Sequence, residues 1–78
     1  MPPTNAIEFP LRGDHIALDA LLKATGLVAS GGNAKMLIAN GDVRVNGETE
    51  TRRGRKLREG DRVAVGDTFI RVTAQRPD

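Results

Sequence analysis

The 78-residue sequence lacks cysteine, tryptophan and tyrosine, and it contains only two phenylalanines and one histidine. Without cysteine there is no disulfide framework, no thiolate metal site and no cysteine nucleophile. A single histidine supplies neither a cluster of metal ligands nor an acid–base pair of histidines. We therefore expect no metal, no cofactor and no small-molecule substrate, and the scarcity of aromatic residues predicts an aliphatic core.

Long hydrophobic runs are also missing. No apolar stretch approaches the roughly 18 residues that cross a membrane. Residues 1–5 lack the basic start and apolar stretch of a secretory signal. We expect a soluble, cytoplasmic monomer without a membrane partner. The length predicts one domain over residues 7–74, between a flexible N-terminus at 1–6 and a flexible tail at 75–78.

The first part of the chain predicts one strand and two helices. Apolar and polar residues alternate over 7–12, but Pro10 cannot donate a hydrogen bond to a neighbouring strand, so this short strand should lie at a sheet edge. Leucines at helical spacing predict a helix over 16–25, with Asp14 as its N-cap and Gly26 just past its end. Ser30 predicts the N-cap of a second helix over 31–40, which Gly41 ends.

From residue 43 the apolar period changes to two. The pattern predicts a strand over 43–45, a type I′ turn at Asn46-Gly47 and a partner strand over 48–51. A basic connection at 52–58 and a turn at 59–61 lead to a second hairpin, with strands at 62–65 and 68–73. The order predicts an α+β fold in which a two-helix hairpin packs on a small curved antiparallel sheet. With Met36 at its margin, the predicted core consists of Leu18, Leu21, Leu22, Leu37, Ile38, Val43, Val45, Leu57, Val63, Val65, Ile70 and Val72.

Charge is distributed unevenly along the chain. Twelve Lys and Arg against ten Asp and Glu leave a net charge of +2. Residues 44–58 contain six basic residues and two acidic ones, Glu48 and Glu50, which gives this window a net charge of +4. Phosphates would suit the window because arginine binds their oxygens in a bidentate way. A solvated loop with weak Arg–Glu pairs, each worth at most about 1 kcal/mol, explains the same residues almost as well.

The start of the second predicted helix could also attract an anion. Ser30-Gly31-Gly32-Asn33 leaves the first backbone amides of the helix with little side-chain cover, and Lys35 follows off the apolar stripe. The glycines by themselves are equally consistent with an ordinary capped helix.

Together these residues resemble the central motif of the S4 RNA-binding domain family. The motif runs from Ser30 through Ala34-Lys35, Leu37-Ile38 and Gly41 to Val43-Arg44-Val45-Asn46-Gly47. Leu57-Arg58-Glu59-Gly60-Asp61 is similar to the family's later Leu-x-x-Gly-Asp, and the resemblance covers about residues 16–65. The short N-terminal extension and the glycine-rich start of the second helix resemble those of the small stand-alone YbcJ-like or YaaA-like members.

The resemblance implies a non-catalytic module that binds structured RNA, with ribosomal RNA as one candidate. Gly31 replaces a common family arginine, so one phosphate contact is absent or is made by backbone amides. Because Phe9 and Phe69 are the only aromatic residues, and both are expected in the core or on a sheet face, recognition should rest on phosphates and shape. The implied RNA-binding residues are Ser30, Gly31, Gly32, Lys35, Arg44, Arg52, Arg53, Arg55, Lys56 and Arg58.

Two other functions compete with this one. The basic loop could instead dock an acidic protein, which would make the chain a protein-interaction adaptor. An enzyme is disfavoured, because the sequence shows neither a nucleophile–base pair nor a glycine-rich phosphate loop followed by Lys-Ser/Thr.

Overall fold

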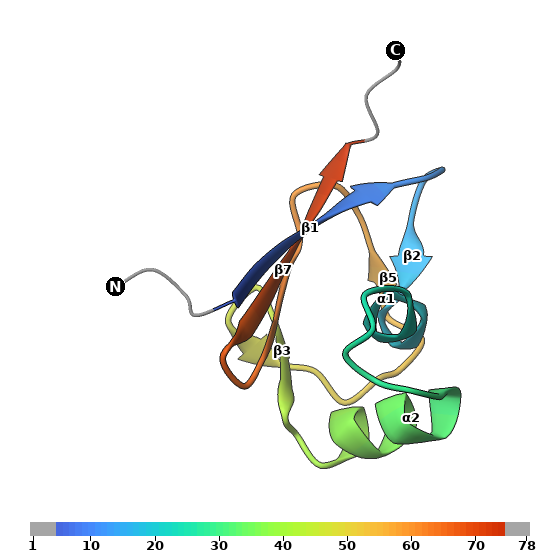
Figure 1. Ribbon diagram of the computed structural model, residues 1–78, viewed down its shortest axis with the longest axis vertical. Coiled ribbons are helices and arrows are strands. Elements are labelled where there is room, and N and C mark those ends of the chain that lie inside the picture. The colour runs from blue at the N-terminus through green and yellow to red at the C-terminus, as the bar shows by residue number, and fades with distance from the viewer. Residues whose placement is uncertain (1–4, 75–78) are drawn as a thin grey trace.

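The computed structural model describes residues 5–74 and forms two layers, with both helices on one side of a sheet (Figure 1). Residues 1–4 and 75–78 lie outside the described residues, so the flexible ends stay a prediction there, whereas residues 5 and 6 already belong to the first strand. In chain order the elements are β1 (Asn5–Leu11), β2 (Ile16–Ala17), α1 (Leu18–Ala24), α2 (Gly31–Ala39), β3 (Val43–Val45), β4 (Glu48–Thr49), β5 (Lys56–Leu57), β6 (Arg62–Val65) and β7 (Thr68–Ala74).

Five of the strands form one sheet in the order β1-β7-β6-β3-β4. β1 pairs parallel with β7, whereas the other neighbouring strands pair antiparallel. The sheet is therefore mixed, and the prediction of an antiparallel sheet is wrong at this edge. β1 does lie at the edge, as Pro10 predicts, because a residue without an N–H is tolerated where one side of a strand has no partner.

The turn between β3 and β4 has the predicted geometry. Asn46 and Gly47 have φ values of 53° and 86°, the positive pair that a type I′ turn requires. The Asn46 side chain also fixes the start of β6: its Oδ1 accepts a 2.9 Å hydrogen bond from the Arg62 N–H, and its Nδ2 donates to Oδ1 of Asp61 at 3.1 Å. The turn residue therefore holds two hairpins together.

The first helix begins later than predicted. Ile16 and Ala17 form β2, which pairs antiparallel with β5 as a separate two-stranded sheet. α1 therefore begins at Leu18, and Ala17 occupies the N-cap position without a side-chain hydrogen bond. The prediction of Asp14 as the cap is wrong. The basic connection predicted at 52–58 contains β5, the strand with which β2 pairs.

Both helices end in the same backbone motif. After α1, Gly26 has φ of 78° and donates to the Lys23 carbonyl, while the Leu27 N–H donates to the Leu22 carbonyl, each at 3.1 Å. Gly41 closes α2 in the equivalent way, with φ of 82°. These are Schellman motifs, which pair carbonyls that the last turn leaves unsatisfied. The glycine stops predicted from the sequence are confirmed.

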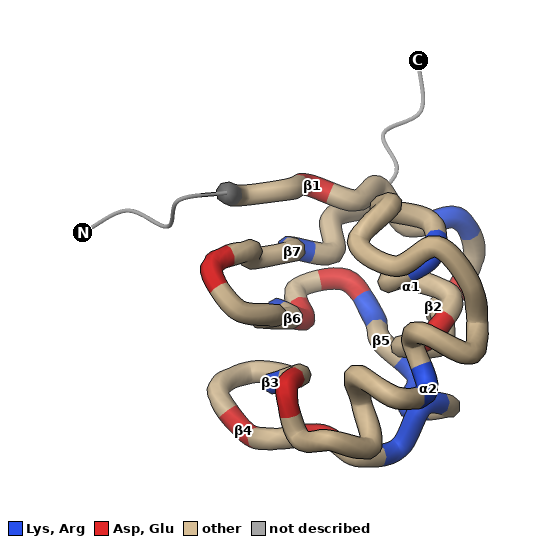
Figure 2. The backbone as a smooth tube through the Cα atoms, turned by 60° about the horizontal axis from the view of Figure 1, so that its bottom comes forward, with Lys and Arg blue, Asp and Glu red and all other residues tan. Residues whose placement is uncertain are grey.

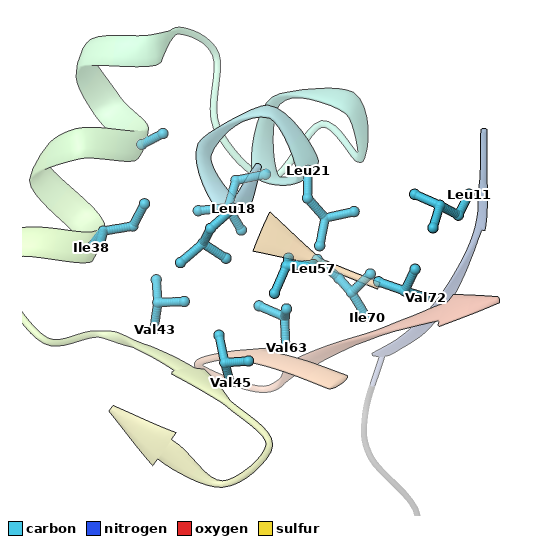
Figure 3. Packing of buried hydrophobic residues seen from close by; sticks show 12 residues of the cluster. Leu11, Leu18, Leu21, Ile38, Val43, Val45, Leu57, Val63, Ile70 and Val72 are labelled. Atoms are coloured by element: carbon cyan, nitrogen blue, oxygen red, sulfur yellow. The ribbon is translucent and has the colours of Figure 1, made fainter. Parts of the chain in front are cut away.

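The aliphatic core lies between the helices and the sheet face that they cover (Figure 3). Leu37 and Val65 are half-buried at its border, while Leu11 and Ala34 join it. Met36 is 65% exposed, so its predicted place at the core margin is wrong. The buried residues are Leu11, Leu18, Leu21, Leu22, Ala34, Ile38, Val43, Val45, Leu57, Val63, Ile70 and Val72.

Candidate functional site

The start of α2 is open to solvent. Ser30 is the N-cap, in an extended conformation, and its hydroxyl oxygen accepts a 3.3 Å hydrogen bond from the Asn33 N–H. Helix geometry leaves the N–H groups of Gly31 and Gly32 without an intrahelical acceptor. Both glycines are exposed, and a Cβ added at Gly31 would meet nothing within 4 Å. The predicted cap is confirmed, and the amides beside it are uncovered.

Lys35 lies one turn further along α2. It is exposed, whereas the neighbouring Ala34 is buried against the core. The helix therefore places the full positive charge of Lys35 next to the partial positive charge of its own N-terminal amides.

The basic segment, residues 52–58, is fixed against α1 by its backbone. The Leu18 N–H donates to the Arg55 carbonyl at 2.9 Å, and the Asp19 N–H donates to the Arg53 carbonyl at 3.0 Å. The segment thus accepts from the first two N–H groups of α1, for which the N-cap residue Ala17 supplies no side-chain acceptor. Because α1 packs against α2, this anchoring brings the basic segment to the same side of the molecule as the helices.

Glu50 organises two of the arginines. The residue is only 6% exposed, and its Oε2 accepts hydrogen bonds from both the backbone N–H and the Nε of Arg52 at 3.1 Å. Its Oε1 accepts from Nη2 of Arg52 at 3.2 Å and from Nη1 of Arg55 at 2.8 Å. Hydrogen bonds from Arg52 and then Arg55 lower the pKa of the Glu50 carboxyl to about 2. The carboxylate is charged and fully hydrogen-bonded, unlike the weak surface pair expected from the sequence.

The remaining cations of the basic segment project into solvent. Arg53, Lys56 and Arg58 are exposed and make no ion pair with any residue in 5–74. Figure 2 shows Lys and Arg positions gathered around α2 and β5, whereas several acidic positions follow the strands of the large sheet. Below, the helix-side surface means Ser30, Gly31, Gly32, Lys35 and the basic segment.

Arg44 does not join this surface. Val43 and Val45 are buried beneath the helices, so the alternation of β3 turns Arg44 to the opposite face of the sheet. There it borders a groove together with Arg62 and Phe69. The ten residues implied by the resemblance therefore fall on two faces of the molecule.

Within residues 5–74 no three His, Asp or Glu side chains gather as a metal site would require. No helix in the described part of the chain is both long and apolar enough to cross a bilayer.

Most of the chain matches a known family. The S4 domain family matches residues 9–73 of the chain. The chain belongs to the S4 domain family. The resemblance noted in the sequence is confirmed, and so is the α+β S4-like fold, apart from the parallel edge strand.

Similar S4 proteins occur in Escherichia coli and Bacillus subtilis. "Putative RNA-binding protein YbcJ" of Escherichia coli (strain K12) is 40% identical over 60 residues, which cover 77% of this chain and 86% of that protein. "Probable ribosome maturation protein RlbA" of Bacillus subtilis (strain 168) is 44% identical over 52 residues, which cover 67% of this chain and 73% of that protein. The solution structure of E. coli YbcJ matches with a TM-score of 0.63 and 32% identity, covers 95% of this chain and 92% of that one, and is described as revealing an αL motif involved in RNA binding.

The structure adds residues that the sequence interpretation missed. Glu50 was expected to be a surface acid, and its role depends on burial that its neighbours in sequence do not indicate. Arg62 and Arg71 were not singled out, although each alternates with buried apolar residues of β6 and β7. The alternation of arginines with apolar residues along β6 and β7 is the sequence signal that the sheet has a second, charged face.

Proposed function

We propose that this S4 protein is a non-catalytic module that binds structured RNA through the helix-side surface. The observation that supports this most directly is the anchoring of the basic segment to α1. Two backbone hydrogen bonds, from Leu18 to Arg55 and from Asp19 to Arg53, hold the segment beside the helical pair. A charged loop without such anchoring would be an ordinary solvated surface.

The chemistry of the helix-side surface suits phosphate. The amides of Gly31 and Gly32 offer neutral donors at the positive end of α2, and Lys35 adds a full charge beside them. Arg53 and Lys56 offer further donors that no carboxylate of residues 5–74 occupies. With few aromatic residues available, such contacts would recognise the shape and backbone of folded RNA rather than its bases.

Ribosomal RNA is the structured RNA that we favour, with the cytoplasm as the compartment and a monomer as the binding form. Support comes from the name of the B. subtilis relative, which refers to ribosome maturation. The E. coli relative is named for RNA binding.

A charge-matched pair of variants tests the surface. R53E/K56E should abolish most binding of a fluorescein-labelled RNA hairpin measured by fluorescence anisotropy. R12E/K23E changes the net charge equally at exposed positions elsewhere and should leave most of the affinity intact. For about five phosphate contacts, log K should fall against log salt with a slope of about −3.5 to −4.5. Equal losses in the two variants, or a flat salt response, would show that this surface does not bind RNA.

The adaptor alternative makes a different prediction. If the basic segment docks an acidic protein, the partner should remain bound after nuclease treatment of a purified complex. Loss of all partners with nuclease agrees with RNA as the ligand.

A further inference from the structure

The outer sheet face is a second surface with its own chemistry. We define it by five residues on the side of the large sheet that points away from α1 and α2: Arg44, Arg62, Ala64, Phe69 and Arg71. Glu8 of β1 lies on the same side, opposite Arg71. Their neighbours along each strand, such as Val63 and Ile70, are buried in the core. No helix of the described chain covers this face (Figure 1).

Three of these residues lie in one row across adjacent strands. Arg44 of β3 is opposite Ala64 of β6, and Ala64 is opposite Phe69 of β7. Neighbouring strands are about 4.8 Å apart, so Phe69 and Arg44 stand about 10 Å apart with only a methyl group between them. The three residues line part of an open groove of about 1090 Å³, which Leu37 of α2 also borders. Phe69, which is 43% exposed, is one of the residues that line it.

The next row carries two arginines directly opposite each other. Arg62 of β6 pairs in register with Arg71 of β7, and both are exposed. Like charges in direct cross-strand positions repel. Neither arginine makes an ion pair within residues 5–74, although Glu8 follows Arg71 in the same row and Asp42 lies at the rim of the groove. An anion placed between the two arginines would relieve the repulsion.

We propose that the outer sheet face binds a single-stranded segment of RNA, with one base stacked on Phe69 and its phosphates contacted by Arg44, Arg62 and Arg71. The inference goes beyond the proposed function, because it adds a second, separate site for the same class of ligand. A base would use the features of this face: the exposed Phe69 ring, the small side chain of Ala64 beside it, and the surrounding cations. An acidic peptide would use the cations but has no need of an exposed ring.

The experiment uses a fluorescein-labelled oligouridylate, which forms no hairpin, and the full chain. Phe69→Ala should weaken its binding by roughly 5- to 150-fold, the range for loss of one stacked base. Met36→Ala removes the other large exposed apolar side chain of residues 5–74, which lies on α2, and should leave oligouridylate affinity unchanged. When oligouridylate is added to ¹⁵N-labelled protein, the amide signals of β3, β6 and β7 should shift. The same addition should shift these signals less in the Phe69→Ala variant.

Each alternative has its own outcome. If Phe69→Ala leaves the affinity for oligouridylate unchanged, the inference is wrong and charge attraction alone explains the binding. The same holds if polyglutamate displaces the RNA equally well from the wild type and from the Phe69→Ala variant. A dimer in light scattering that Phe69→Ala dissociates would show that a second copy covers the face, and would overturn it as well.

The inference and the proposed function can fail separately. If the wild type binds the RNA hairpin and R53E/K56E does not, but oligouridylate binding ignores Phe69, then only the outer-face inference fails. If oligouridylate binding depends on Phe69 while R53E/K56E and R12E/K23E bind the hairpin equally, the helix-side proposal fails and the outer-face site stands.

Discussion

Nη1 of Arg55 donates a 2.8 Å hydrogen bond to Oε1 of Glu50, a carboxylate that is almost fully buried. The negative charge of Glu50 offsets one positive charge of the basic segment. The bond also fixes the side chain of Arg55, whose carbonyl accepts a hydrogen bond from the first N–H of α1. A prearranged loop loses less conformational freedom on binding than a mobile one. Glu50 therefore acts as a positioning residue for the helix-side surface.

Glu50→Gln should destabilise the fold by about 1–3 kcal/mol near neutral pH, because charged hydrogen bonds to Arg52 and Arg55 are lost. The pKa of the Glu50 carboxyl falls from 4.5 to about 2 in the folded protein. Its stabilisation is therefore complete above pH 4.5 and is lost as the pH falls towards 2. Urea denaturation of both proteins should show the stability difference shrinking over that range.

Glu48→Gln provides the matched control, since Glu48 is exposed and makes no ion pair within the described residues. A difference between wild type and Glu50→Gln that stays constant from neutral pH to pH 2 would contradict the assigned role.

Gly31 marks the position where the family commonly has arginine. Gly31→Arg should strengthen binding of an RNA hairpin, because nothing lies within 4 Å of the new Cβ and the added cation joins the α2 amides. Gly31→Gln makes a similar backbone change without the charge. Anisotropy titrations should show a higher affinity for the RNA hairpin in Gly31→Arg than in Gly31→Gln. Equal affinities would mean that no phosphate lies near residue 31.

Two glycines should respond to alanine with opposite signs. Gly31→Ala should stabilise the fold by up to about 1 kcal/mol, because glycine is a poor helix residue. Gly26→Ala should destabilise it by about 1–2 kcal/mol, because φ at Gly26 is 78° and an L residue is strained there. Chemical denaturation measures both. A destabilised Gly31→Ala protein would indicate that the first turn of α2 differs from that described above.

Arg62→Gln should raise the melting temperature, since it removes one member of the cross-strand pair with Arg71. Relief of about 0.2–1 kcal/mol corresponds to about 1–8 °C in a domain of this size. Arg12→Gln, at an exposed position outside the sheet, should leave the melting temperature nearly unchanged. A fall in melting temperature for Arg62→Gln would show that the two arginines do not repel each other. If the outer face binds RNA, the same Arg62→Gln variant should also bind oligouridylate less tightly.

Local signals in the sequence predicted local structure well. Ser30 caps α2, Gly26 and Gly41 end the helices, and Asn46-Gly47 forms the turn, because each depends only on residues a few positions away. Such elements can be derived from backbone geometry and short side chains alone.

Long-range pairing is where sequence reasoning failed. Ile16 reads as the first turn of a helix, yet its backbone pairs with that of Leu57. Likewise, nothing near Pro10 indicates that its strand would run parallel to one at the other end of the domain.

The candidate site was predictable in part for the same reason. Charge density located the basic segment, and the family pattern identified Ser30 and Lys35. Neither could show that Glu50 is buried, nor that β3 turns Arg44 to the other face, because both depend on how distant segments pack.

The parallel ladder of β1 and β7 also decides how the protein meets mechanical force. Asn5 lies opposite Thr68 at one end of the ladder, and Leu11 lies opposite Ala74 at the other. Tension applied between residues 5 and 74 therefore pulls the two strands past each other along their length. All the ladder hydrogen bonds bear the load together in shear, rather than opening one after another as in a zipper.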